Sequence, residues 1–164
     1  MRPPVISNSS PIIHLGKINQ LHLLKDLFGE ILIPKAVHEE CVVQGKNRPE
    51  VDAIVEADWL KVHETTDKNL IKLLRSEIDQ GEAESIALAI QIQAGLILLD
   101  DSEAREKARL YDLPICGTLG VLLRAKLNGK LSSLSTALTD LQASGFWIQN
   151  NLVDRLLLEA NEKK

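Results

Sequence analysis

Residues 96–102, Leu-Ile-Leu-Leu-Asp-Asp-Ser, decide the fold of this chain. Four apolar residues end abruptly in two carboxylates and a hydroxyl, a pattern typical of a buried strand that runs into a polar turn. Just before them, residues 81–94 show the spacing of an amphipathic helix that opens with two glutamates, and a glycine follows as its expected end. Ligands in open α/β sheets bind beyond the carboxyl ends of the strands. We therefore expect these acids to hold a divalent metal ion.

The composition is typical of a globular, cytoplasmic protein. The chain has 164 residues, of which 45% are hydrophobic and 26% charged, so we expect one domain over residues 1–164 with a substantial core. No apolar run has the length of a membrane span and no secretory pattern opens the chain, which argues against a membrane location. A net charge of −4 argues mildly against non-specific binding of nucleic acid, although a local basic surface can exist beside an acidic metal site. An aromatic content of 3% argues against a platform on which bases stack.

Strand and helix patterns alternate along the rest of the chain. We expect core strands at residues 4–7, 31–33, 96–99 and 114–116, and a further short strand at residues 60–63. Helical spacing of apolar residues predicts helices at 11–17, 19–28, 34–43, 50–59, 67–78, 102–111, 119–127, 133–143 and 150–161. Because the pattern contains no hairpin signal, it predicts an α/β fold in which a parallel sheet carries helices on both faces.

The two glutamates of the central helix are not equivalent. Glu82 and Glu84 lie two residues apart and therefore point in different directions around the helix axis. Glu82 borders the apolar stripe, which makes it the better candidate for a site beside the sheet. However, Asp79 and Glu82 also have the spacing of a capping box. Spacing alone does not decide between a ligand role and a capping role.

The same ambiguity holds for the acids at the strand ends. Asp100, Asp101 or Ser102 is expected to cap the next helix, but two adjacent aspartates exceed what one cap needs. Glu40 lies on the same side of its helix as an apolar core residue, and Asn8 ends the first strand. Each has an ordinary alternative, as a solvated glutamate and as a helix cap. A nucleotide-binding α/β domain is a weaker alternative, because the chain has no glycine-rich phosphate loop.

Five segments in order resemble the PIN-domain family, in particular its PIN-like branch of small prokaryotic proteins. They are residues 5–13, 33–40, 81–89, 98–101 and 117–122. The resemblance spans nearly the whole chain. It implies a three-layer α/β/α sandwich with a central parallel sheet and Mg²⁺- or Mn²⁺-dependent cleavage of RNA. Many members are ribonuclease toxins that pair with a small antitoxin protein.

The resemblance also implies which residues form the site. It places the catalytic acids at Glu40, Glu82 and Asp101. The metal ligands that it implies are Asn8, Glu40, Glu82, Asp100 and Asp101, and the supporting residues are Ser10, Glu84 and Thr118. This set suits the chemistry, because Mg²⁺ prefers oxygen ligands and a metal-bound water can become the nucleophile.

One position departs from the family pattern. Asn8 stands where active nucleases of the family usually carry an aspartate. An amide oxygen can ligate a metal but brings no negative charge, so we expect weaker Mg²⁺ binding and a shift toward Mn²⁺. Two functions therefore stay open. One is a metal-dependent endoribonuclease, with the toxin of a toxin–antitoxin pair as one form of it. The other is a catalytically impaired PIN-like module that binds RNA or a protein partner.

Two further expectations concern partners. Lys46, Arg48 and Arg105 are candidates for binding the RNA backbone, although basic side chains are most often simply solvated. Arg105 follows Asp101 by one helical turn, and the other two lie in the loop after the helix of Glu40. A homodimer is expected through the leucine-rich helices at 19–28 and 67–78, because a small sandwich does not readily cover both faces itself.

Overall fold

The strands form one parallel sheet at the centre of the molecule. The computed structural model describes residues 3–163, and within them the strand order is β3-β2-β1-β4-β5. The strands are β1 Val5–Ser7, β2 Ile31–Ile33, β3 Leu60–Val62, β4 Leu96–Leu98 and β5 Ile115–Cys116. From β1 the chain runs outward to one side through β2 and β3, and then returns to build β4 and β5 on the other side. The two directions diverge between β1 and β4, where ligands bind in open α/β sheets.

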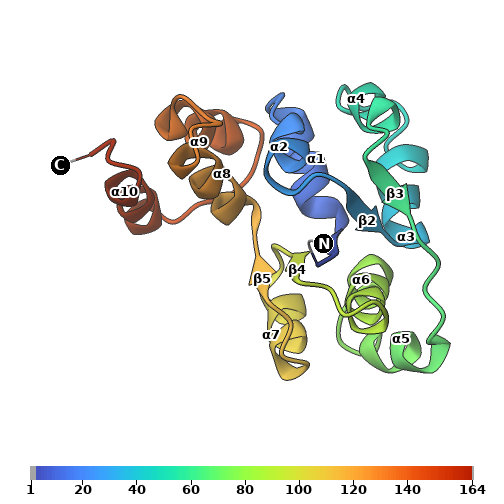
Figure 1. The fold of residues 1–164 in the computed structure, drawn as a ribbon. Coiled ribbons are helices and arrows are strands. Elements are labelled where there is room, and N and C mark those ends of the chain that lie inside the picture. The colour runs from blue at the N-terminus through green and yellow to red at the C-terminus, as the bar shows by residue number, and fades with distance from the viewer. Residues whose placement is uncertain (1–2, 164) are drawn as a thin grey trace.

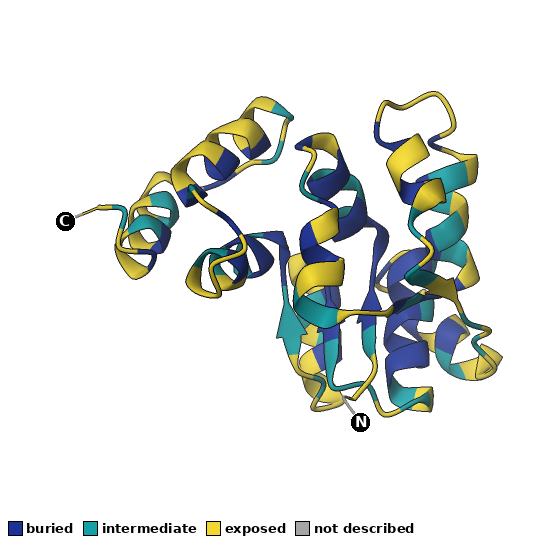
Figure 2. Cartoon of the chain, turned by 45° about the horizontal axis from the view of Figure 1, so that its top comes forward, coloured by how far each residue is buried: buried dark blue, intermediate teal, exposed yellow. Residues whose placement is uncertain are grey.

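Helices cover both faces of this sheet and confirm the predicted three-layer α/β/α fold (Figure 1). The elements are α1 Ser9–Lys17, α2 His22–Phe28, α3 Lys35–His38, the π-helix η1 Glu39–Val43, α4 Val51–Glu56, α5 Lys68–Leu74, α6 Gln80–Gln91, α7 Ser102–Leu110, α8 Thr118–Leu127, α9 Leu134–Ala143 and α10 Asn150–Glu159. The helix sides that meet the sheet are buried and the outer sides are exposed (Figure 2). No helix among residues 3–163 is long and apolar enough to cross a membrane.

Alternation along the strands divides the core in two. Ile97 packs with α5, α6 and α7 on one face, whereas its neighbour Leu98 packs with the helices of the other face. This follows from the geometry of a strand, in which successive side chains point to opposite sides. The central strands are buried on both faces, as expected for a parallel sheet.

Two sequence expectations about local structure are corrected. The predicted helix 34–43 is a short α-helix followed by the π-helix Glu39–Val43, whose wider turn carries Glu40. The central helix ends at Gln91 rather than at Gly95, and Gln93 takes the left-handed conformation, with φ 53°. Gly95 serves a close approach instead, since a Cβ there would lie 2.5 Å from Pro3 Cβ.

The apolar faces on which the dimer expectation rests are largely covered within the chain. Leu23 and Leu24 of α2 are fully buried, and α2 packs against α8. On α5, Ile71 and Leu74 are buried and Leu73 is 66% exposed. The homodimer therefore stays a prediction, and the apolar residues of α2 and α5 do not support it.

Candidate active site

The central strands β1 and β4 bring two polar segments together. Ser7 pairs with Leu98 in the parallel register, so both strands end at the same level. The backbone N–H of Asn8 then donates to the Leu98 carbonyl at 3.0 Å and extends the pairing by one residue. As a result, the segment that starts at Asn8 and the segment that starts at Asp100 leave the sheet side by side.

Asn8 carries an unsatisfied amide oxygen at this point. It occupies the N-cap position of α1, but its side chain makes no capping hydrogen bond. The residue is 5% exposed, and its Oδ1 atom is buried with no hydrogen-bond partner among the described residues. Nearly all buried polar atoms in native proteins have a partner, so an orphan of this kind calls for an ion or a water molecule.

Glu40 directs a carboxylate oxygen toward the same place. Its Oε2 atom accepts a hydrogen bond of 2.9 Å from Ser9 Oγ, which fixes the side chain. Its Oε1 atom lies 2.0 Å from the position that a Cβ would occupy on Gly81, and Asn8 Oδ1 lies 3.3 Å from that position. The absence of a side chain on Gly81 is what lets these two oxygens approach the first turn of α6 together.

Glu82 has a capping role and keeps one oxygen free for a ligand role. Its backbone N–H donates to Asp79 Oδ1 at 2.8 Å, and its Oε1 atom accepts from the Asp79 backbone N–H at 3.0 Å, which completes the capping box. The residue is only 7% exposed. Burial, together with the charges of Asp79 and Asp101, raises the pKa of the Glu82 carboxyl to about 7, although the Asp79 N–H opposes the shift.

Burial also raises the pKa of the Glu40 carboxyl. The charges of Asp79 and Glu84 act in the same direction, and the hydrogen bond from Ser9 opposes them. Both glutamates thus stand in surroundings that penalise their negative charge. A bound cation would relieve that penalty for each of them.

The adjacent aspartates Asp100 and Asp101 have different roles, which the sequence alone did not assign. Asp101 is the cap of α7, because its Oδ2 atom accepts from the Ala104 N–H at 3.0 Å. Asp100 instead joins three elements beyond the strand ends. Its Oδ1 atom accepts from the Thr118 N–H at 2.7 Å, and its Oδ2 atom accepts from Ser10 Oγ at 2.6 Å and from Thr118 Oγ1 at 2.7 Å. Asp100 therefore holds the supporting residues Ser10 and Thr118 in place.

Glu84 uses both of its oxygens for structural hydrogen bonds. Its Oε1 atom accepts from the Ala36 N–H at 3.2 Å, at the start of α3, and its Oε2 atom accepts from Gln80 Nε2. Its charge still reaches Glu40, where it helps to raise the pKa. Glu84 thus links α6 to α3 beside the site.

The three predicted RNA-binding residues lie in two different regions. Arg105 lies beside the strand ends: its Nη1 atom approaches the Leu99 carbonyl at 3.4 Å and lies near Gly117. Lys46 and Arg48 are exposed in the loop before α4. That loop ends at Glu50, whose Cβ would lie 2.9 Å from a Cβ on Gly16.

Gly16 stands at the far end of α1, eight residues from Asn8 and therefore about 12 Å along the helix. The packing of Glu50 against Gly16 places the end of this loop at the opposite end of α1 from the orphaned amide, whereas its start lies near Cys41, since a Cβ on Gly45 would lie 2.9 Å from the Cys41 carbonyl oxygen. The sequence expectation that this loop reaches over the site has no support in this packing.

Oxygen ligands are available here, but the acids alone do not enclose an ion. Within residues 3–163, no three His, Cys, Asp or Glu side chains are grouped so that they could hold a metal. Glu40, Glu82 and Asp101 each use one oxygen to fix their position, and their second oxygens make no hydrogen bond to the described residues. Of these oxygens, Glu40 Oε1 lies with Asn8 Oδ1 at the first turn of α6, and such a pair suits Mg²⁺ or Mn²⁺, since Mg²⁺ typically binds one or two carboxylates and keeps several waters.

The fold and the comparisons define the class of the protein. The structure has a five-stranded parallel sheet with helices on both faces and acids beyond its central strands. A family model described as a PIN domain matches residues 4–162, so the chain belongs to the PIN-domain family. Among curated proteins, none matches the chain.

Sequence reasoning missed several participants in the site. The hydrogen bond from Ser9 to Glu40 and the close approach of Glu40 to Gly81 have no signature in a single sequence. A group of basic residues beside Glu84 was also missed: Lys35, Lys68, Lys72 and Arg75. They come from separate parts of the chain, so no local spacing signals that they line one cavity.

Proposed function

We propose that the chain is a metal-dependent endoribonuclease whose site is formed by Asn8, Glu40, Glu82 and Asp101. The observation that supports this most strongly is the buried, unpartnered oxygen of Asn8 beside the free oxygen of Glu40. These two oxygens lie beyond β1 and β4, where the strand order reverses, and oxygen atoms are the ligands that Mg²⁺ prefers. The membership of the PIN-domain family supports the nuclease class.

Each residue of the site has a defined task in this proposal. Asn8 Oδ1 and Glu40 Oε1 would hold Mg²⁺ or Mn²⁺, and Ser9 keeps Glu40 in position through its hydrogen bond. Glu82 and Asp101 would contact the metal-bound waters with their free oxygens. When bound, the ion supplies an activated water and offsets charge on the attacked phosphate. Asp100 has a positioning task in this proposal, because its three hydrogen bonds hold Ser10 and Thr118 beside the site.

The amide at Asn8 favours a second candidate function. With one neutral ligand in place of a carboxylate, the site has a lower charge and holds a divalent ion less firmly. A module that has lost catalysis and binds RNA or a protein partner is consistent with this change. RNA cleavage separates the two functions directly.

The decisive assay measures cleavage of a labelled single-stranded RNA with Mn²⁺, with Mg²⁺ and with EDTA. We expect cleavage with either ion and none with EDTA. Glu40→Gln should lose at least about tenfold in rate, because it removes charge from the ligand set while the amide oxygen can still accept from Ser9. Glu39→Gln is the matched control, since Glu39 is a neighbour on the same π-helix and makes no hydrogen bond through its side chain among the described residues.

The outcomes divide clearly. Equal cleavage with EDTA and with metal, or equal cleavage by Glu40→Gln and Glu39→Gln, would contradict the proposed site. The toxin role stays a prediction and has its own test: induced expression of the wild type should arrest bacterial growth, and expression of Glu40→Gln should not. Co-expression of a small antitoxin protein should then restore growth to the wild type.

A further inference from the structure

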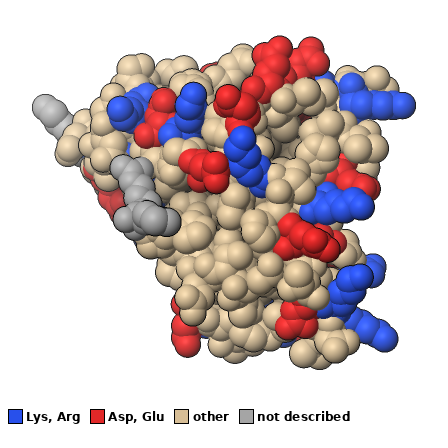
Figure 3. All heavy atoms as spheres, turned by 45° about the vertical axis from the view of Figure 1, so that its right-hand side comes forward, with Lys and Arg blue, Asp and Glu red and all other residues tan. Residues whose placement is uncertain are grey.

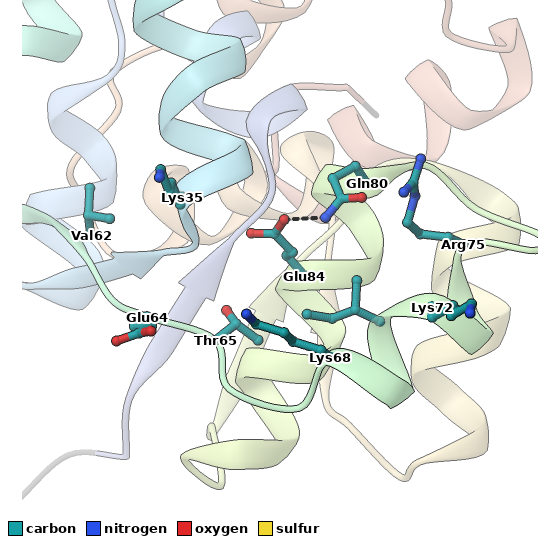
Figure 4. A pocket seen from close by; sticks show the side chains of 10 residues that line it. Lys35, Val62, Glu64, Thr65, Lys68, Lys72, Arg75, Gln80 and Glu84 are labelled. Carbon is teal, nitrogen blue, oxygen red and sulfur yellow. Dashed lines mark hydrogen bonds between the residues drawn. The ribbon is translucent and has the colours of Figure 1, made fainter.

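A cavity of about 800 Å³ opens beside the candidate site, between α3, the segment after β3, α5 and the start of α6 (Figure 4). Its basic lining residues are Lys35, Lys68, Lys72 and Arg75, and its acidic lining residues are Glu64 and Glu84. Figure 4 shows Lys35 on one side of Glu84, and the other three basic residues on the side of α5. The cavity therefore presents cations from both of its sides.

The lining of this cavity is positively charged on balance, because four basic side chains face two acidic ones. Among the described residues, none of its four basic side chains forms an ion pair. Glu84 and Glu64 offset part of this positive charge, and Glu84 is held in place by hydrogen bonds from the Ala36 N–H and from Gln80. This excess of positive charge occurs in a chain whose net charge is −4. On the face shown in Figure 3, acidic and basic side chains are interspersed, and basic ones gather along one edge.

The remaining lining suits a sugar and a base beside a phosphate. Val62 and Ile71 contribute apolar surface. Thr65 also lines the cavity, and its Oγ1 atom is buried without a hydrogen-bond partner among the described residues. A volume of about 800 Å³ lies within the range of small-molecule sites and is enough for a single nucleotide unit.

The cavity and the proposed metal site share the first turns of α6. Gln80 and Glu84 line it from the first turns of α6, where Gly81 and Glu82 also lie. Lys35 begins the helix that leads directly into the π-helix of Glu40. A strand bound in the cavity would therefore lie on the same elements, α6 and α3, that carry or precede Glu82 and Glu40.

We propose that this cavity binds the phosphodiester backbone of a single nucleic-acid strand beside the metal site. Phosphate is the group that several unpaired Lys and Arg side chains recognise together. Because the proposed ligand places a sugar and a base in the cavity beside the phosphate, we expect a single strand to bind more tightly than a duplex, whose bases are paired. The identity of the strand as substrate rests on the proposed nuclease function, but the binding does not.

The test measures fluorescence anisotropy of a labelled 12-nucleotide RNA, the same sequence as DNA, and its duplex, all in EDTA so that no cleavage occurs. The variant is Lys68→Gln/Arg75→Gln, and the matched control is Lys25→Gln/Arg155→Gln, which neutralises exposed cations on α2 and α10. We expect the cavity variant to bind either single strand at least tenfold more weakly and the control to stay within twofold. The slope of log K against log salt should become shallower by about 0.7 for each phosphate that the variant no longer neutralises.

Three results would overturn the inference: no binding of single strands by the wild type, equal losses in the two variants, or duplex binding as tight as single-strand binding. The nuclease proposal is judged separately. Loss of binding in the cavity variant with no cleavage by the wild type would support this inference alone. Metal-dependent cleavage that the cavity variant retains, with unchanged binding, would support the nuclease proposal alone.

Discussion

Asn8 and Glu40 direct one side-chain oxygen each at the same small region of α6. Asn8 Oδ1 lies 3.3 Å and Glu40 Oε1 2.0 Å from the position of an absent Cβ on Gly81. The two residues are 32 positions apart and come from an N-cap and a π-helix. This convergence is the structural basis of the proposed metal site.

The first prediction concerns the space that Gly81 leaves open. Glycine to alanine inside a helix usually stabilises a protein by about 0.5–1 kcal/mol. In Gly81→Ala the new Cβ would collide with Glu40 Oε1, so Glu40 must turn away from Asn8. We expect a Tm close to that of the wild type but a loss of at least about tenfold in Mn²⁺-dependent cleavage.

The control for this prediction is a double-mutant cycle. Because both changes disable the same oxygen, Gly81→Ala/Glu40→Gln should lose little more activity than Glu40→Gln alone. Full activity of Gly81→Ala would show that the position of Glu40 does not matter for cleavage.

The second prediction is the pH dependence of stability without metal. The pKa of Glu82 is about 7 in the folded protein, against an ordinary value of 4.5. The folded state therefore binds more protons between these values, and stability falls as pH rises from about 4.5 to 7. Glu82→Gln keeps an oxygen for the capping box but cannot ionise, so its Tm should fall less over this range.

Thermal melting in EDTA from pH 5 to pH 7.5 measures this effect. At pH 7.5 we expect Glu82→Gln to melt roughly 4 °C above the wild type. The same substitution at Glu56, which is exposed at the end of α4 and makes no side-chain hydrogen bond or ion pair among the described residues, is the control and should leave the pH profile unchanged. Parallel profiles for the wild type and Glu82→Gln would contradict the assigned environment.

The third prediction concerns Asp100 as a structural centre. Thr118 is fully buried, and its hydroxyl donates to Asp100 at 2.7 Å. Thr118→Val keeps the shape but removes a hydrogen bond to a charged acceptor, which should cost about 1.5–3 kcal/mol of unfolding free energy. Thr139→Val, on the exposed side of α9, is the control and should cost less than about 0.5 kcal/mol by urea denaturation. Equal costs would show that the Asp100 cluster contributes little.

The strand patterns made the fold predictable, whereas the roles of individual acids depended on distant partners. The apolar run before Asp100 and the alternation of strands with helices indicated a parallel sheet, and the structure confirms it. Local spacing also identified the capping box of Asp79 and Glu82. Local spacing could not distinguish the roles of Asp100 and Asp101, because the partners Ser10 and Thr118 lie 90 and 18 residues from Asp100.

The remaining features arise from packing between elements. The π-helix at Glu40 interrupts a segment whose apolar spacing predicted one regular helix. A widened turn of this kind is common at functional sites and has no simple sequence signal. The basic cavity likewise appears only when α3 and α5 pack against α6. Sequence reasoning instead chose Lys46 and Arg48 for their nearness in the chain to Glu40.

The last prediction concerns the charge at Asn8. Asn8→Asp adds the carboxylate that active family members usually carry at this strand end. Without metal, the added charge should repel Glu40 and lower the Tm modestly. With metal, it should strengthen binding and raise the gain in Tm, because a ligand that binds only the folded state stabilises it.

The most direct measurement is thermal melting of the wild type, Asn8→Asp and Glu40→Gln in EDTA and in Mn²⁺. We predict a Mn²⁺-dependent rise in Tm for the wild type, a larger rise for Asn8→Asp, and little or none for Glu40→Gln. Identical melting with and without Mn²⁺ in both the wild type and Asn8→Asp would contradict a metal site at Asn8 and Glu40.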